Sequence, residues 1–118
     1  MNLNLNEYQS LAMRTCSITD NPKDMLNHAL LGLASEAGEA AALLQKVYQG
    51  HPSPLEDGKA RQHLIVELGD CLWMLAEAAQ AIGCSLDTVA IRNINKLRAR
   101  YPEGFEPERS LHRKEGDI

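Results

Sequence analysis

Aromatic residues are scarce in this chain of 118 residues, which has one tryptophan, three tyrosines and one phenylalanine. A core with so few rings must be filled mostly by Leu, Ala, Ile, Val and Met. β-Branched residues are also few, and alanine and leucine are good helix formers, so the composition favours helices over sheets. With 44% hydrophobic and 24% charged residues, the chain is otherwise typical of one globular domain.

Cysteine is also sparse, and its three residues lie far apart, at Cys16, Cys71 and Cys84. Their odd number and the lack of a C-x-x-C spacing disfavour a disulfide framework or a zinc site. We expect reduced thiols in a cytoplasmic protein, because the first residues also lack the pattern of a signal peptide.

Long apolar runs are absent as well. The longest apolar stretch, residues 64–83, is interrupted by three acidic residues, so we expect no membrane span. Positive charge is in deficit, with a formal net charge of −4. Nucleic-acid-binding proteins rely on basic surface, so this balance disfavours a nucleic-acid partner and suits a protein that binds divalent cations.

Four segments with apolar residues at helical spacing predict an all-α, four-helix-bundle-like fold, since short connections join them. The predicted helices cover about residues 4–16, 22–48, a third that begins at Ser53 or just after Gly58 and ends at Ile82, and 86–100. Asn21, followed by Pro22, and Ser85 are expected to cap the second and fourth helices.

Domain organisation follows from the same pattern. Residues 1–105 are expected to form one domain that contains all four helices. Residues 106–118 are rich in Gly, Pro and charged side chains, so we expect them to form an extended or partly disordered tail.

The informative feature is the position of the acids. At about 100° per residue, Glu36 falls in the middle of the apolar stripe of the second helix, and Glu39 flanks the same face. The third helix repeats the arrangement with Glu67 and Asp70, and Glu77 points in a similar direction seven residues later.

Buried unpaired carboxylates are costly and repel one another, and a divalent cation offsets both effects. Two acidic pairs, Glu36/Glu39 and Glu67/Asp70, facing each other from adjacent helices would form an all-oxygen site suited to Mg²⁺, with Mn²⁺ as a substitute. The alternative is that some of these acids are solvated and the others pair with Lys or Arg. Two pairs, each on an apolar stripe, favour the metal site.

A basic face on the fourth helix complements these acids. Asn93, Lys96 and Arg100 are spaced by three and four residues, so they share one side of that helix and would suit phosphate oxygens. The alternative is that the arginines near the end of the helix complement its dipole.

Three segments together resemble the MazG-like nucleotide pyrophosphohydrolase family, within the all-α NTP pyrophosphatases. They are GLASEAGEAAALLQK (Gly32 to Lys46), ELGDCLWML (Glu67 to Leu75) and NINKLRARYP (Asn93 to Pro102). The resemblance covers about residues 22–105.

The resemblance implies residue roles and an activity. Glu36, Glu39, Glu67 and Asp70 would bind magnesium, and Asn93 and Lys96 would contact the nucleotide or its phosphates; Arg100 joins them on geometry alone. The implied reaction converts a nucleoside triphosphate, ribo or deoxy, to the monophosphate and pyrophosphate, with a house-cleaning role in the nucleotide pool.

Two details of that activity are expected from the residues. Glu36 and Glu39 are the candidates for the general base, and the sequence does not distinguish them. The third helix is apolar on nearly every side, so four short helices cannot cover it. We therefore expect a homodimer or homotetramer, as the resemblance also implies.

Two other functions compete with this one. A di-iron carboxylate bundle requires Glu-x-x-His on two helices, whereas both third positions here are acids, Glu39 and Asp70. A non-catalytic helical module that binds metal and nucleotide is the alternative to an enzyme, because turnover cannot be read from the sequence.

Overall fold

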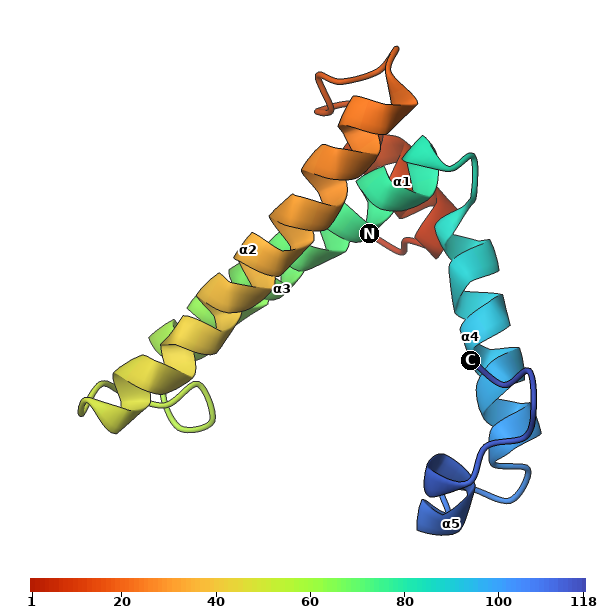
Figure 1. Cartoon of the computed structure of the whole chain (residues 1–118). Helices are drawn as coiled ribbons and strands as arrows, with labels where there is room; N and C mark the ends of the chain where they lie inside the picture. The colour runs from red at the N-terminus through yellow and green to blue at the C-terminus, as the bar shows by residue number, and fades with distance from the viewer.

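The computed structural model of the chain describes residues 1–118 and consists of helices joined by short loops, without a strand (Figure 1). The all-α prediction is therefore confirmed. The helices are α1 (Leu5–Met13), α2 (Pro22–Tyr48), α3 (Gly58–Ala81), α4 (Leu86–Arg100) and α5 (Pro107–Leu111). Figure 1 shows α2 and α3 side by side as a long antiparallel pair, with α1 across one end.

Side-chain caps explain where the first four helices begin. In each, the residue before the helix accepts a hydrogen bond from a backbone N–H three residues later, and these residues are Asn4, Asn21, Asp57 and Ser85. The predicted caps of α2 and α4 are thus confirmed. Of the two starts considered for α3, the structure has the later one, because Asp57 caps the helix while the Ser53 hydroxyl accepts from Leu55 N only two residues on.

Helix α1 fixes the turn between α3 and α4. Gln9 is buried, and its amide donates to the side-chain oxygen of Gln80 and to the carbonyl of Cys84, while its own oxygen accepts from Leu86 N. A buried amide is stable only when its donors and acceptor are satisfied in this way. The indole of Trp73 donates to Ala12 O nearby, which also holds α1 on α3.

The chain bends by 98° between α3 and α4. Gly83 lies at the bend with φ of +69°, a conformation that side chains with a Cβ rarely adopt. As a result α4 leaves the α2–α3 pair and forms a second arm (Figure 1). Within one chain the helices do not close into a bundle, and completion by further copies stays a prediction.

Many large apolar side chains remain exposed. Only ten residues are buried, and the core is a small cluster where α1, α3 and the start of α4 meet. Leu31 on α2 is 74% exposed and Val66 on α3 is 60% exposed, and α4 exposes Val89, Ile91 and Ile94. Exposed apolar surface spread over three helices is typical of faces that another chain covers.

No single helix is both long and apolar enough to cross a membrane, although α3 and α4 pass that test together as a bent pair.

The segment after Phe105 differs from the extended or partly disordered tail that the sequence led us to expect. Residues Pro107–Leu111 form α5, which begins with a proline at its first position, where the missing N–H costs nothing. The chain then returns to α4, where Arg100 donates to both carboxylate oxygens of Asp117, at 2.8 and 2.7 Å. Such a bidentate pair holds the end of the chain against α4.

Candidate metal centre

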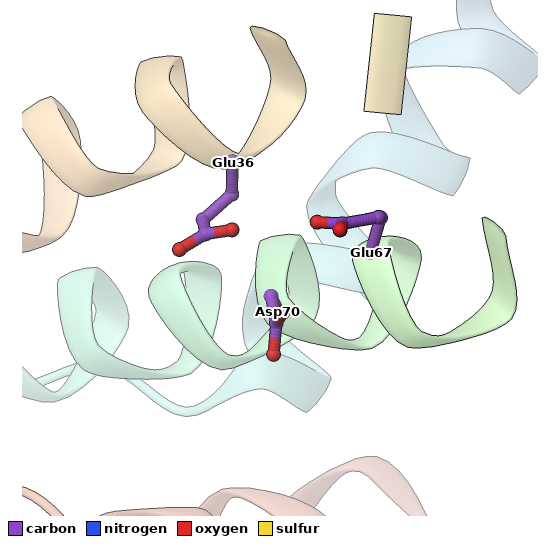
Figure 2. Close-up of side chains that lie close together, drawn as sticks. All are labelled: Glu36, Glu67 and Asp70. Carbon is purple, nitrogen blue, oxygen red and sulfur yellow. The ribbon is translucent and has the colours of Figure 1, made fainter. Parts of the chain in front are cut away.

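Three carboxylates of α2 and α3 lie close together. Glu36 projects from α2 toward α3, where Glu67 and Asp70 lie one turn apart (Figure 2). One oxygen from each of the three residues lies within 4.8 Å of the other two. The predicted approach of acids from the two long helices is therefore present, with three of the four expected residues.

The surroundings of Glu67 fit a cation. The residue is only 9% exposed, and its Oε2 is buried without a hydrogen-bond partner. Its Oε1 lies 3.1 Å from Nε2 of His63, one turn earlier on α3. Leaving a buried acceptor unsatisfied costs about 1–3 kcal/mol, and a bound cation would remove that cost. The acid cluster, by which we mean Glu36, Glu67 and Asp70, can hold a divalent ion.

The pKa values of residues at the acid cluster also indicate a concentration of negative charge there. Partial burial, together with the charges of Glu39, Asp70 and Glu67, raises the pKa of Glu36. Burial and the charge of Asp70 also raise the pKa of Tyr8 on α1. Negative charge is thus concentrated where these helices meet, and carboxylates that repel each other are stabilised by a cation between them.

Glu39 lies outside the cluster. It is exposed one turn along α2, and its charge contributes to the raised pKa of Glu36. Direct binding of a metal by Glu39 stays a prediction.

The residues predicted to bind substrate are on the other arm. Asn93 and Lys96 are exposed on α4, beyond the 98° bend, and α4 runs away from the acid cluster (Figure 1). Arg100 binds Asp117, which lowers the pKa of that carboxyl. Within one chain the structure does not bring these three residues to the acids, so their contact with the nucleotide stays a prediction.

A second buried acid was not recognised from the sequence. The sequence pattern gives Glu77 a direction similar to that of Asp70 but no partner and no role. In the structure it is completely buried: its Oε1 lies 2.6 Å from Nδ1 of His28, and its Oε2 accepts from the thiol of Cys16 at 3.2 Å. Burial and this hydrogen bond raise the pKa of the Cys16 thiol. The sequence spacing could have indicated this pair. His28 is eight residues before Glu36 and Glu77 is seven after Asp70, so two antiparallel helices that bring Glu36 to Asp70 also bring His28 to Glu77.

Comparison with known proteins identifies the family of this chain. The model of the MazG nucleotide pyrophosphohydrolase domain matches residues 26–105, more than half of the chain. The chain is also similar to the Gene 37 protein of Mycobacterium phage L5, with 35% identity over 79 residues, which are 67% of this chain and 68% of that protein. The match covers most of α2 and the whole of α3 and α4, and the chain belongs to the MazG nucleotide pyrophosphohydrolase family.

Proposed function

We propose that the chain hydrolyses nucleoside triphosphates, ribo or deoxy, to the monophosphate and pyrophosphate, with Mg²⁺ as the cofactor and Mn²⁺ as a substitute. The observation that supports this most is the buried, partnerless oxygen of Glu67 within the acid cluster. Membership of the MazG family connects that site with nucleotide pyrophosphohydrolysis. By resemblance, the cellular role is the clearance of unwanted nucleotides.

The acid cluster would hold the cation through Glu36, Glu67 and Asp70. When bound, magnesium neutralises phosphate charge and polarises the phosphorus that water attacks. His63 would hold Glu67 in place through its contact with Oε1, since partners of this kind orient the groups that bind a metal.

Of Glu36 and Glu39, we favour Glu39 as the general base. Glu36 lies within the cluster, and its oxygens would be occupied by the cation. Glu39 is exposed, close enough to influence Glu36, and free of other partners. We assign the acceptance of the proton from the attacking water to Glu39, because a base needs an oxygen that is not already a metal ligand.

Asn93 and Lys96 would reach the phosphates from a second copy of the chain. They lie on α4, which does not pack along α2 and α3 of its own chain. The exposed apolar side chains of α2, α3 and α4 supply the surface for such an assembly, a homodimer or homotetramer. Lys96 would then stabilise charge on the leaving pyrophosphate.

Product analysis tests this function. The chain is incubated with Mg²⁺ and a panel of NTPs and dNTPs, and we expect equal amounts of monophosphate and pyrophosphate from at least one of them. Release of the nucleoside diphosphate and inorganic phosphate would contradict the proposed position of cleavage. Tight nucleotide binding without any product would favour the alternative, a non-catalytic module that binds metal and nucleotide.

A further inference from the structure

Gly32 marks a close contact between α2 and α3. A Cβ atom built on Gly32 would lie 2.5 Å from Sδ and 2.7 Å from Cε of Met74, a residue of α3. These distances are well below the roughly 3.5–4.0 Å of ordinary contact between heavy atoms, so a side chain there would force the thioether or the two helices to move. None of the other glycines has such a neighbour within 4 Å.

The backbone of α2 does not itself require glycine at this position. Gly32 lies in the interior of the helix, where glycine is less favourable than alanine because it loses more conformational freedom on folding. Its φ is not positive, so no left-handed conformation excludes a side chain. The contact with Met74 therefore explains this glycine better than local conformation does.

The contact lies one helical turn from the acid cluster on both helices. Glu36 is four residues after Gly32, and Asp70 is four residues before Met74. Because α2 and α3 are antiparallel (Figure 1), the contact and the two acids lie at successive levels of the pair, about 6 Å apart along the helices. A change in helix spacing at Gly32 would therefore also change the spacing of the acids.

The acid cluster depends on that spacing. Glu36 is its member on α2, while Glu67 and Asp70 are on α3, and one oxygen from each lies within 4.8 Å of the other two. Mg²⁺ requires oxygen ligands at about 2.0–2.1 Å in nearly ideal octahedral geometry. The groups of such a site must be held within about 0.5 Å of that geometry, so a small separation of the helices would weaken binding.

We propose that Gly32 is a positioning residue for the metal centre. Its missing side chain leaves the space that Met74 fills, and this contact holds α2 close enough to α3 for Glu36 to share a cation with the other two acids. The inference rests on the function proposed above for the identity of the cation. Neither Gly32 nor Met74 contacts the cation, and both act only through the spacing of the helices.

Calorimetric titration of the full chain with Mn²⁺ alone, without nucleotide, tests this role apart from turnover. We expect Gly32→Ala to raise the Kd about tenfold, since residues that support metal ligands typically change affinity by about that much. The matched control is Gly69→Ala, an exposed position in the interior of α3 with no neighbour to collide with, which should keep the wild-type Kd.

Removal of the colliding atoms should restore binding. Every atom of Met74 that lies near the added Cβ is beyond its own Cβ, so Gly32→Ala combined with Met74→Ala should have a Kd close to that of the wild type. Met74→Ala alone completes the double-mutant cycle. A merely structural role of Gly32 would lower the Tm without this recovery of metal affinity.

Two results would overturn the inference. If folded Gly32→Ala binds Mn²⁺ with the wild-type Kd, the thioether turns aside without moving the helices. If Gly32→Ala and Gly69→Ala lose affinity equally, or the double variant does not recover, contact with Met74 is not the cause. Should Gly32→Ala not fold, Met74→Phe crowds the same contact from α3, and wild-type affinity in that variant would be equally decisive.

The same titration separates this inference from the proposed function. If the chain binds Mn²⁺ with the expected dependence on Gly32 but hydrolyses no nucleotide, the function is wrong and Gly32 still positions a metal site. If nucleotides are hydrolysed and Gly32→Ala binds Mn²⁺ like the wild type, the function stands and the role of Gly32 is wrong.

Discussion

The imidazole of His28 lies against the completely buried carboxyl of Glu77, with 2.6 Å between Nδ1 and Oε1. The other carboxyl oxygen accepts from the thiol of Cys16. Both oxygens of Glu77 therefore have partners, whereas Oε2 of Glu67 on the same helix is buried without one. We interpret Glu77 as a carboxyl that holds helices together, and we propose that Glu67 binds a ligand.

Replacing His28 with alanine should destabilise the chain. The change removes a partner of a fully buried carboxyl, and this should lower the free energy of unfolding by about 1–3 kcal/mol. The loss should be smaller than for a pair in which both partners are buried, because His28 is itself half exposed. In a domain of this size, each kcal/mol lowers the Tm by about 4 °C. Thermal unfolding followed by circular dichroism measures the effect.

Glu67→Gln, unlike His28→Ala, should not destabilise the chain once metal has been removed with a chelator. This change removes a charge that has an unsatisfied oxygen and repels its neighbours. The Tm should stay the same or rise, and added Mg²⁺ should stabilise the variant less than the wild type. A fall in Tm as large as that of His28→Ala would mean that Glu67 is a structural carboxyl.

The raised pKa of Glu36 predicts a specific pH dependence. A carboxyl whose pKa is higher in the folded state binds more protons there, so its ionisation costs stability as pH rises from about 4.5 through its folded pKa. The metal-free Tm of the wild type should fall across this range relative to Glu36→Gln, and saturating Mg²⁺ should reduce the difference. A difference that does not change with pH or with Mg²⁺ would contradict the repulsion within the acid cluster.

Some of these features could be predicted from the sequence, and the reasons are local. Asn21 and Pro22 signal the start of α2, and a helical period alone places Glu36 on its apolar stripe. Because both acid-bearing helices are long, their apolar faces must meet, and the acids on those faces meet with them.

Other features depend on tertiary structure. Glu39 lies outside the cluster because a small rotation of α2 decides whether an edge residue faces α3 or solvent. Glu77 has partners from two other parts of the chain, His28 on α2 and Cys16 in the connection after α1, and contacts of this kind depend on the tertiary fold. The separation of α4 from the acids results from the turn at Gly83, whose direction the sequence does not specify.

The ion pair of Arg100 with Asp117 should hold the last residues against α4. The guanidinium lowers the pKa of Asp117, so the stabilisation is present above the ordinary carboxyl pKa and is lost as pH falls through the lowered value. Asp117→Asn should make the bond after Arg113 more accessible, which trypsin cleavage at neutral pH would reveal as a several-fold faster loss of the tail. Glu115→Gln, an exposed acid nearby without an ion pair, should cleave at the wild-type rate.

A site shared between two chains predicts complementation between two impaired variants. Lys96→Ala should lower kcat/KM about tenfold or more by removing a charged contact, and Glu67→Gln should abolish metal-dependent activity. In a mixture of the two refolded together, about half of random dimers are mixed and each has one intact site, so about a quarter of the wild-type activity should return. Activity no higher than the sum of the separate variants would place Lys96 and the acids of one site in the same chain. Sedimentation of the wild type as a monomer at low micromolar concentration would contradict the assembly itself.

Catalysis by the acid cluster is tested most directly by the rate of pyrophosphate release, at saturating Mg²⁺, from the best nucleotide of the panel. The wild type is compared with Glu67→Gln and with the control Lys23→Gln, each shown to be folded by circular dichroism. We expect Glu67→Gln to lose more than about a hundredfold of the rate because it disables a metal ligand, and Lys23→Gln to match the wild type. A Glu67→Gln chain that is folded and releases pyrophosphate at the wild-type rate would show that the cluster between α2 and α3 is not the catalytic metal site.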